Sequence, residues 1–247
     1  MTRLAAESDR RISKAGRVST GIPGLDAMIE GGFLLGRSVL IAGGPGAGKT
    51  IACGQFLHHG ITRKERGIYV SFDEKRDRFY HEMSRFHWDF EQLEREGSFR
   101  FLDASPSPDL EADNHRSLAQ IVKSLSRLTS DLGARRVVVD GLAALGFEFP
   151  DAVDRRRAFL QLIQTLTSSN VTSLLTSEIR TSALDRPIQV EEYLADGTIV
   201  MQNLLINRTL TRTIQVEKMR GTEVDGEIRP YQINSRGVEV FNTEKVI

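Results

Sequence analysis

The sequence lacks most of the features that would place it outside the ordinary globular proteins. Its one cysteine, Cys53, excludes a disulfide within the chain and a zinc site built from cysteines. No apolar run approaches the ~20 residues of a membrane-spanning helix, and the first residues lack the apolar core of a secretory signal. Lys+Arg and Asp+Glu balance at 33 each, so the overall basic charge typical of nucleic-acid-binding proteins is missing. These absences favour a protein of the reducing cytoplasm that binds no membrane.

The sequence does have enough apolar residues for one large domain. Of 247 residues, 40% are hydrophobic and 27% are charged, which is typical of a folded rather than a disordered chain. Residues 1–17 are polar and rich in Lys and Arg. We expect them to form a tail, either loosely docked or a solvated helix, ahead of a single domain over residues 18–247.

Short apolar runs alternate with helical patterns along most of the chain. Buried strands are predicted over residues 38–42, 67–72, 99–102, 136–140 and 171–177. Apolar residues recur at helical spacing between 118 and 128 and again between 159 and 166. The alternation predicts an α/β fold with a mostly parallel central sheet flanked by helices. Beyond residue 197, four strand patterns without helices predict a C-terminal antiparallel β extension of the same sheet.

One segment matches a phosphate-binding motif. Residues 43–50, GGPGAGKT, follow the pattern G-x-x-x-x-G-K-[ST] between a predicted strand and a helix expected over residues 49–59. Glycines let backbone N–H groups curl around a phosphate, and the helix N-terminus adds a positive dipole end. Lys49 is expected to reach the β- and γ-phosphates and the Thr50 hydroxyl to bind Mg²⁺. The residues predicted to bind nucleotide are Gly43, Gly44, Pro45, Gly46, Ala47, Gly48, Lys49 and Thr50.

Three acidic residues follow predicted strands. Asp140 ends the strand over residues 136–140, and a carboxylate at that end of a central strand lies where α/β sheets bind ligands. It is expected to complete the Mg²⁺ site with Thr50. Asp73 and Glu74 follow the strand over residues 67–72, and one of them is expected to orient or deprotonate the attacking water. The alternative for Asp73 is a plain N-cap of the next helix.

With these motifs in place, the chain resembles the RecA-like P-loop ATPases and, within them, the KaiC family, over roughly residues 16–242. Besides the phosphate-binding loop and the strand RRVVVD, the segments that carry the resemblance are TGIPGLD (20–26), YVSFDE (69–74), FLDASP (101–106), VEEYLAD (190–196) and KMRGT (218–222). The resemblance implies a RecA-like fold, ATP with Mg²⁺ as the bound nucleotide, and a slow ATPase activity that serves a regulatory or signalling switch. It also implies a homo-oligomeric ring, typically a hexamer, with ATP between neighbours, and an unidentified signalling protein as a further partner.

The resemblance also assigns roles to single residues. The acidic pair that activates water falls on Asp73 and Glu74, with Asp73 where the family carries the longer glutamate. Either Glu74 takes the role or turnover is slow, because a shift of ~1 Å affects catalysis. The family's cations that reach a neighbour's γ-phosphate fall on Lys218 and Arg220, which share one face of a predicted strand; the alternative is a solvated basic edge strand. Glu178 falls at a position near the nucleotide.

Other features bear on competing functions. KaiC itself has two tandem domains, and its self-phosphorylating domain has a Ser-Thr pair where this chain has Glu192 and Tyr193, so we expect neither autokinase activity nor a clock function. A RecA/RadA-like DNA recombination or repair ATPase is an alternative, against which stand the zero net charge and the few cations of residues 180–189. A non-hydrolysing ATP sensor or scaffold is another, motivated by Asp73. The aromatic residues over 86–90 are expected to pack in the core.

Overall fold

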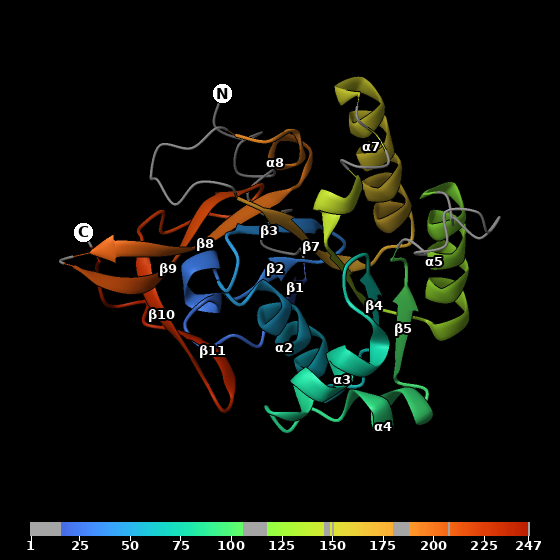
Figure 1. The fold of residues 1–247 in the computed structure, drawn as a ribbon, viewed down its shortest axis with the longest axis horizontal. Coiled ribbons are helices and arrows are strands. Elements are labelled where there is room, and N and C mark those ends of the chain that lie inside the picture. Colours follow the sequence, from blue (N-terminus) through green and yellow to red (C-terminus); the bar gives the residue numbers. More distant parts are fainter. Residues whose placement is uncertain are drawn as a thin grey trace, which may run out of the picture.

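The computed structural model describes residues 16–105, 118–145, 149, 151–179, 188–206 and 208–246. In these ranges nine strands form one sheet, in the spatial order β11-β10-β9-β8-β3-β7-β6-β4-β5 (Figure 1). The strands are β3 (Ser38–Gly43), β4 (Gly67–Ser71), β5 (Phe99–Asp103), β6 (Arg136–Asp140), β7 (Thr172–Glu178), β8 (Gly197–Ile206), β9 (Thr209–Met219), β10 (Arg229–Asn234) and β11 (Gly237–Val240). Outside this sheet, β1 (Arg17–Val18) pairs with β2 (Phe33–Leu34).

The α-helices of the described ranges are α2 (Lys49–Ile61), α3 (Arg76–Ser84), α4 (Phe90–Arg95), α5 (Leu118–Leu132), α7 (Ala152–Ser168) and α8 (Val190–Leu194). Two short 3₁₀ turns, η1 (Asp26–Ile29) and η2 (Leu142–Ala144), accompany them. None of these helices is long and apolar enough to cross a membrane.

The central sheet is parallel from β8 across to β5, and β9, β10 and β11 extend it with antiparallel pairings. The predicted fold class is therefore confirmed. One detail differs, because β8 itself runs parallel to β3 and the antiparallel part begins only at β9. The reason is the crossover through α8, which returns the chain to the sheet in its original direction.

Each side chain along a central strand packs on the face that its alternation dictates. On β3, Val39 and Ile41 join a core formed with α2, α3 and α4. Leu40 and Ala42 of the same strand join a second core formed with α5 and α7. Figure 1 shows the same two groups of helices, with α5 and α7 apart from α2, α3 and α4. The sheet is thus covered on both faces, which leaves its edge at the carboxyl ends of the parallel strands as the place for a ligand.

The element boundaries follow the predictions closely in the centre of the chain. β6 has the predicted limits, and α2 begins at Lys49 as expected but continues to Ile61, two residues beyond the predicted end. At the N-terminus, Arg17 lies in β1 and donates hydrogen bonds to the carbonyls of Ile29 and Gly32 (3.2 and 2.9 Å). Residues 1–15 of the expected tail and residues 180–187 of the segment considered for DNA contacts lie outside the described residues.

Candidate functional site

The phosphate-binding loop joins the end of β3, in the middle of the sheet, to the start of α2. Gly48 adopts a φ of 87°, in the left-handed region that favours glycine. A Cβ at this position would lie 2.6 Å from Cδ1 of Ile233, so a larger residue would also displace the end of that side chain. The loop therefore presents backbone rather than side chains at its turn, as phosphate binding demands.

Lys49 lies against the loop that precedes it. Its Nζ donates hydrogen bonds to the carbonyl oxygens of Gly43 (2.8 Å) and Gly44 (3.1 Å). Burial lowers the pKa of the Lys49 ammonium, while the nearby carboxylates of Asp140 and Glu178 oppose that shift. A phosphate that replaced the two carbonyl acceptors would meet a cation already positioned at the loop.

Asp140, at the end of β6, accepts hydrogen bonds from hydroxyl groups on three elements. Thr50 Oγ1 on α2 donates to Oδ2 at 2.9 Å. The Tyr69 hydroxyl on β4 also donates to Oδ2, and Thr176 Oγ1 on β7 donates to Oδ1. Because β4 and β7 flank β6 in parallel, their carboxyl ends meet at Asp140. Burial raises the pKa of the Tyr69 phenol well above its usual value, and the Asp140 charge adds to that rise, so the phenol stays a donor.

No sequence motif pointed to Tyr69 or Thr176 as part of this site. Tyr69 lies inside YVSFDE, in the middle of β4, and its only signal in the sequence was a place in an apolar strand just before the acidic pair. Both side chains are buried, at 0% and 1% exposure. Their contact with Asp140 depends on strand order, which sequence patterns do not specify.

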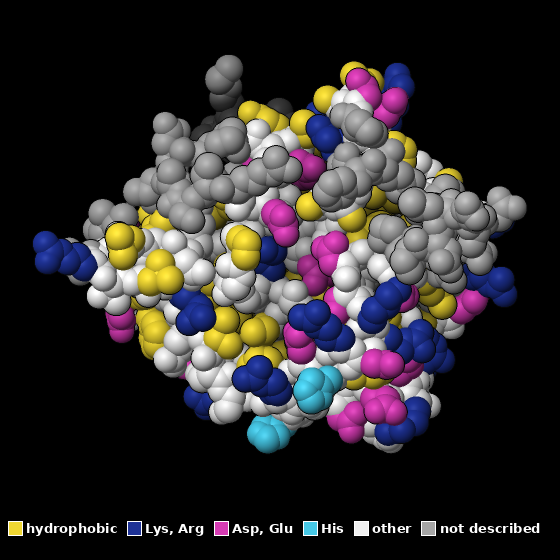
Figure 2. Space-filling model, viewed as in Figure 1, with side chains coloured by type: hydrophobic (Ala, Val, Ile, Leu, Met, Phe, Trp, Pro, Cys, Tyr) yellow, Lys and Arg dark blue, Asp and Glu magenta, His cyan; other side chains and the backbone are white. Residues whose placement is uncertain are grey.

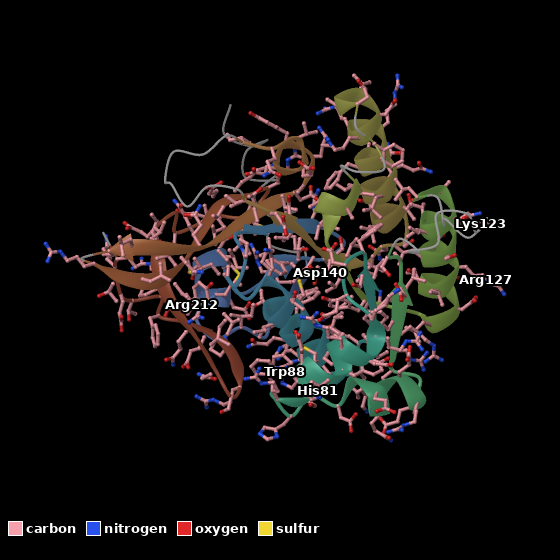
Figure 3. All side chains as sticks on the ribbon, viewed as in Figure 1. His81, Trp88, Lys123, Arg127, Asp140 and Arg212 are labelled. Atoms are coloured by element: carbon pink, nitrogen blue, oxygen red, sulfur yellow. The ribbon has the colours of Figure 1, made fainter. Side chains whose placement is uncertain are left out.

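An open cleft of ≈ 410 Å³ joins these groups to the acidic pair. We call it the acidic cleft, and its lining includes Lys49, Thr50, Asp73, Glu74, Asp140, Thr176 and Glu178. The structure thus brings together the loop lysine and threonine, the strand-end aspartate, both candidate water-activating acids and Glu178. Acidic side chains gather near the middle of the visible face in Figure 2, where Figure 3 places Asp140.

Asp73 and Glu74 face different surroundings within the cleft. Burial raises the pKa of Asp73, with Asp140 and Glu178 adding to the rise and Lys49 opposing it. Burial raises the pKa of Glu74 to about 7. The charge of Glu82 adds to this rise, and the charge of Arg78 opposes it. Arg78 Nε lies 3.2 Å from Glu74 Oε1. The charged neighbours of Asp73 are therefore Asp140, Glu178 and Lys49, whereas those of Glu74 are chiefly Glu82 and Arg78 on α3, with smaller contributions from Asp140 and Asp73.

The N-cap interpretation of Asp73 is wrong. Helix α3 begins at Arg76, its N-cap is Lys75, and no side chain caps it. The Asp73 carboxylate instead lies over Gly141, where an added Cβ would approach Asp73 Oδ2 to 2.2 Å. Gly141 also has a φ of 93°, so glycine is needed there for both space and backbone conformation.

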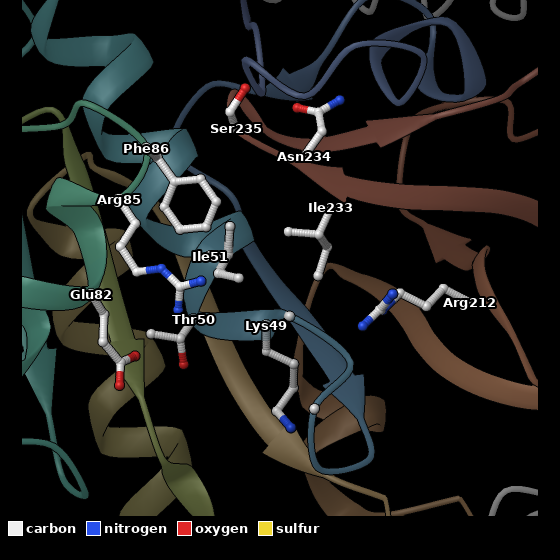
Figure 4. Close-up of a pocket in the computed structure, with 12 residues that line it drawn as sticks. Lys49, Thr50, Ile51, Glu82, Arg85, Phe86, Arg212, Ile233, Asn234 and Ser235 are labelled. Atoms are coloured by element: carbon white, nitrogen blue, oxygen red, sulfur yellow. The ribbon is translucent and has the colours of Figure 1, made fainter.

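A second hollow of ≈ 720 Å³, which we call the aromatic cavity after Phe86, shares Lys49, Thr50 and Glu82 with the acidic cleft (Figure 4). Phe86, two residues after the end of α3, faces Ile233 of β10 across it, and Arg85 and Arg212 point into it from opposite walls (Figure 4). The other lining residues are Gly46, Gly48, Ile51, Glu82, Asn234 and Ser235.

Phe86 corrects one expectation from the sequence. Trp88 and Phe90 are buried as predicted, at 6% and 0% exposure. Phe86 stacks on Trp88, with ring centroids 4.9 Å apart, yet it remains half-buried and lines the aromatic cavity. It is therefore available to a ligand as well as to the core.

Lys218 and Arg220 lie elsewhere. Lys218 Nζ donates to the carbonyls of Glu192 (2.8 Å) and Ala195 (2.6 Å) at the C-terminal end of α8, and Arg220 donates to Tyr193 O (3.3 Å). Arg220 follows β9 by one residue rather than lying within it. In the described part of the chain, neither side chain lines the acidic cleft or the aromatic cavity.

Comparisons with known proteins agree on one family. A sequence model of the KaiC ATPase family matches residues 18–245. The circadian clock protein KaiC3 of Synechocystis sp. is 34% identical over 229 residues, which cover 91% of this chain and 45% of the relative. A UPF0273 protein of Aeropyrum pernix is 32% identical over 239 residues, which cover 94% and 95% of the two chains.

Solved structures lead to the same family. The crystal structure of a KaiC-like protein from Pyrococcus horikoshii superimposes with a TM-score of 0.80 at 32% identity, covering 92% of this chain and 99% of the other. The chain spans about half the length of the clock relatives that it matches, and nearly the whole length of the two archaeal ones.

Proposed function

The chain belongs to the KaiC family of ATPases, and from that premise we propose that it binds Mg²⁺·ATP in the acidic cleft and hydrolyses it. The observation that carries the proposal is the contact between the phosphate-binding loop and β6, where Thr50 Oγ1 lies 2.9 Å from Asp140 Oδ2. Asp73 lines the same cleft. A phosphate-binding loop, a paired hydroxyl and carboxylate, and a further carboxylate are the parts that phosphoryl transfer to water requires.

The oxygen donors at this contact suit Mg²⁺. Thr50 and Asp140 would hold the ion, since hydroxyl and carboxylate oxygens are its preferred protein ligands. The described residues contain no cluster of three or more His, Cys, Asp or Glu side chains able to cage a metal by themselves. That fits an ion that takes only one or two protein ligands and completes its shell with phosphate oxygens and water. Bound there, Mg²⁺ neutralises charge that develops on the β- and γ-phosphates.

Within this site we assign the water-orienting role to Asp73. Asp73 interacts with Lys49 of the loop as well as with Asp140, whereas Glu74, which also interacts with Asp140, is paired with Arg78. A raised pKa makes a carboxylate a better proton acceptor once it is ionised. The shorter side chain of Asp73, compared with the family's glutamate, supports slow turnover.

We assign the nucleoside to the aromatic cavity. It adjoins the acidic cleft through Lys49 and Thr50, so one nucleotide can extend from one hollow into the other. Phe86 and Ile233 supply apolar surface for a base. Arg85 and Arg212 supply positive charge beside the loop, where the phosphates begin.

The ring is proposed from the family resemblance, and the position of Lys218 and Arg220 is consistent with it. If these cations act on a nucleotide, a second copy of the chain must present its cleft to them, because neither lines a cavity with the loop of its own chain within the described residues. We therefore propose a homo-oligomer, hexameric as the family resemblance indicates, formed by the single domain over residues 18–247. Cations supplied by a neighbour tie catalysis to assembly. A regulatory role in the cytoplasm, with a signalling protein as partner, is proposed from the clock relatives.

Steady-state hydrolysis of Mg²⁺·ATP tests the proposal, with gel filtration in the presence and absence of Mg²⁺·ATP. We expect Lys49→Ala to lower kcat/KM by at least about 10²-fold, as expected for loss of a charge that stabilises the transition state. Lys123→Ala on the surface of α5 is the matched control (Figure 3). No hydrolysis by the unmodified chain would contradict the enzymatic part, and a monomer under both conditions would contradict the ring.

A further inference from the structure

Asp140 accepts three side-chain hydrogen bonds, and one of the donors lies behind the acidic cleft. Besides Thr50, which faces the acidic cleft, the hydroxyls of Tyr69 and Thr176 donate to its two carboxylate oxygens. The Tyr69 side chain is fully buried, and it does not line the acidic cleft. The proposed mechanism gives it no role, although a buried tyrosine needs a partner for its hydroxyl.

The ring of Tyr69 packs against two aromatic side chains. Its centroid lies 4.2 Å from that of Phe79 on α3 and 5.6 Å from that of Phe101 on β5, the latter nearly parallel at 13°. Both neighbours are buried. Packing of this kind leaves the ring one orientation, so the hydroxyl approaches Asp140 from a direction set by the core.

Asp140 Oδ2 accepts from Tyr69 on the core side and from Thr50 on the cleft side. A threonine hydroxyl has one hydrogen and two lone pairs. While its hydrogen stays on Asp140 Oδ2, the lone pairs of Thr50 Oγ1 face away from the carboxylate, where a cation can accept them. The direction of those lone pairs therefore depends on where Oδ2 is held, and Tyr69 holds it.

We propose that Tyr69 is a positioning residue of the divalent-cation site, which acts through Asp140 to orient the Thr50 hydroxyl toward Mg²⁺. The inference rests on the proposed binding of Mg²⁺·ATP in the acidic cleft. Removing a partner that orients a metal-binding group typically costs 10–100-fold in metal affinity or activity. Tyr69→Phe keeps the aromatic packing and removes only the hydroxyl. It should therefore weaken the binding of Mg²⁺ and leave the binding of nucleotide without Mg²⁺ unchanged.

Tyr80→Phe is the matched control. The Tyr80 hydroxyl also donates to a carboxylate, Glu94 Oε2 at 2.5 Å, and its ring belongs to the same aromatic group, with its centroid 6.1 Å from that of Phe79. Among the residues described, Tyr80 lies outside the lining of the acidic cleft. The two variants therefore lose the same chemical group from the same cluster, one at Asp140 and one away from it.

The experiment measures binding of a fluorescent, non-hydrolysable ATP analogue, first in EDTA and then over a series of Mg²⁺ concentrations. For Tyr69→Phe we expect the affinity in EDTA to equal that of the unmodified chain. The Mg²⁺ concentration that produces half of the gain in affinity should be about 10-fold higher or more. Tyr80→Phe should match the unmodified chain in both conditions. Equal affinity in EDTA also shows that the variant is folded.

A Mg²⁺ dependence in Tyr69→Phe equal to that of the unmodified chain overturns the inference, and so does an equal shift in Tyr80→Phe. An unmodified chain whose affinity gains nothing from Mg²⁺ overturns the proposed function and the inference with it, so the two failures are distinguishable. If Tyr69→Phe does not fold, Thr176→Val removes the donor to Asp140 Oδ1, with Thr176→Ser as its control. The orientation of the Asp140 carboxylate depends on the donors to both of its oxygens, so a raised Mg²⁺ requirement in Thr176→Val but not in Thr176→Ser is then expected. Its absence overturns the inference.

Discussion

Lys49 and Lys218 have similar hydrogen bonds and very different surroundings. Both ammonium groups donate to backbone carbonyls, Lys49 within the phosphate-binding loop and Lys218 at the end of α8. Burial lowers the pKa of both. Lys49, however, shares the acidic cleft with Asp73, Asp140 and Glu178, whereas Lys218 shares no described cavity with the loop.

On the proposed ring, the difference separates the groups that one chain builds alone from the cations that a second chain would use. The region around Lys49 already contains every group that we assign to phosphate and cation binding. The region around Lys218 and Arg220 is satisfied by its own carbonyls and by Asp196, whose Oδ1 lies 3.7 Å from Arg220. Its cations would exchange those partners for a phosphate only when a neighbour presents one.

The largest effect is expected inside the acidic cleft. Asp73→Asn should lower kcat by about 10²–10³-fold, because general-base catalysis contributes on that scale. Glu74→Gln is the matched control, and we expect it to lose much less, since Glu74 is paired with Arg78. Single-turnover hydrolysis measures both. A greater loss in Glu74→Gln would exchange the roles of the two acids.

An intermediate effect is expected at the second region. Lys218→Met and Arg220→Ala should each lower kcat by about 10²-fold, as for removal of one group that stabilises transition-state charge. Nucleotide affinity should change little. An unchanged kcat in both variants would show that the two cations serve only to hold α8 in place.

Mixing two variants sharpens this test. Lys49→Ala retains Lys218, and Lys218→Met retains the loop, so a mixed assembly contains interfaces with both parts intact. Mixing the two should restore hydrolysis if a neighbour supplies Lys218. Two variants that assemble together without any recovery would place the action of Lys218 within its own chain.

The smallest effect concerns stability, and it contrasts the cleft with the outer surface. Burial raises the pKa of Glu74 to about 7 in the folded state from its usual 4.5. The folded chain therefore binds this proton more tightly than the unfolded chain, and the contribution of Glu74 to stability is lost as pH rises from 4.5 to 7. Glu74→Gln should gain unfolding free energy relative to the unmodified chain between pH 5 and pH 8.

Urea unfolding at both pH values measures the gain. Glu91→Gln is the control, because Glu91 is exposed on α4 and pairs with Arg95 at 3.1 Å. The difference in unfolding free energy between Glu91→Gln and the unmodified chain should be nearly the same at pH 5 and pH 8, since exposed ion pairs contribute little. A Glu74→Gln difference that is equally constant would show that burial does not raise this pKa.

The parts of the fold that depend on local pattern were predictable. The limits of β6 and the start of α2 follow from an apolar run and from a glycine turn before a helix. The parallel arrangement follows from strands that alternate with helices, and it places Thr50, Asp73 and Asp140 at one edge. The parallel direction of β8 was missed because no sequence pattern announced the crossover through the five-residue helix α8.

The parts of the site that depend on contacts between distant segments were not predictable. Tyr69 meets Asp140 only because β4 lies beside β6, although 71 residues separate them in the chain. Phe86 belongs to an aromatic run that is typical of a core, yet it is half-buried and lines the aromatic cavity together with Ile233 of β10. Asp73 reads as a helix cap, but α3 starts later and frees its carboxylate for the cleft.

The sequence by itself determined the phosphate-binding loop, the α/β architecture and the resemblance to a family, because glycine conformations, strand and helix periodicity and ordered motifs are local properties of a chain. Only the tertiary structure decided which groups surround Asp140, which acid faces Lys49 and what holds Lys218. Those contacts follow from the order of strands in the sheet and from the packing of helices on its two faces. Neither the strand order nor the helix packing can be predicted from one segment, because both depend on how distant segments of the chain bury their apolar residues together.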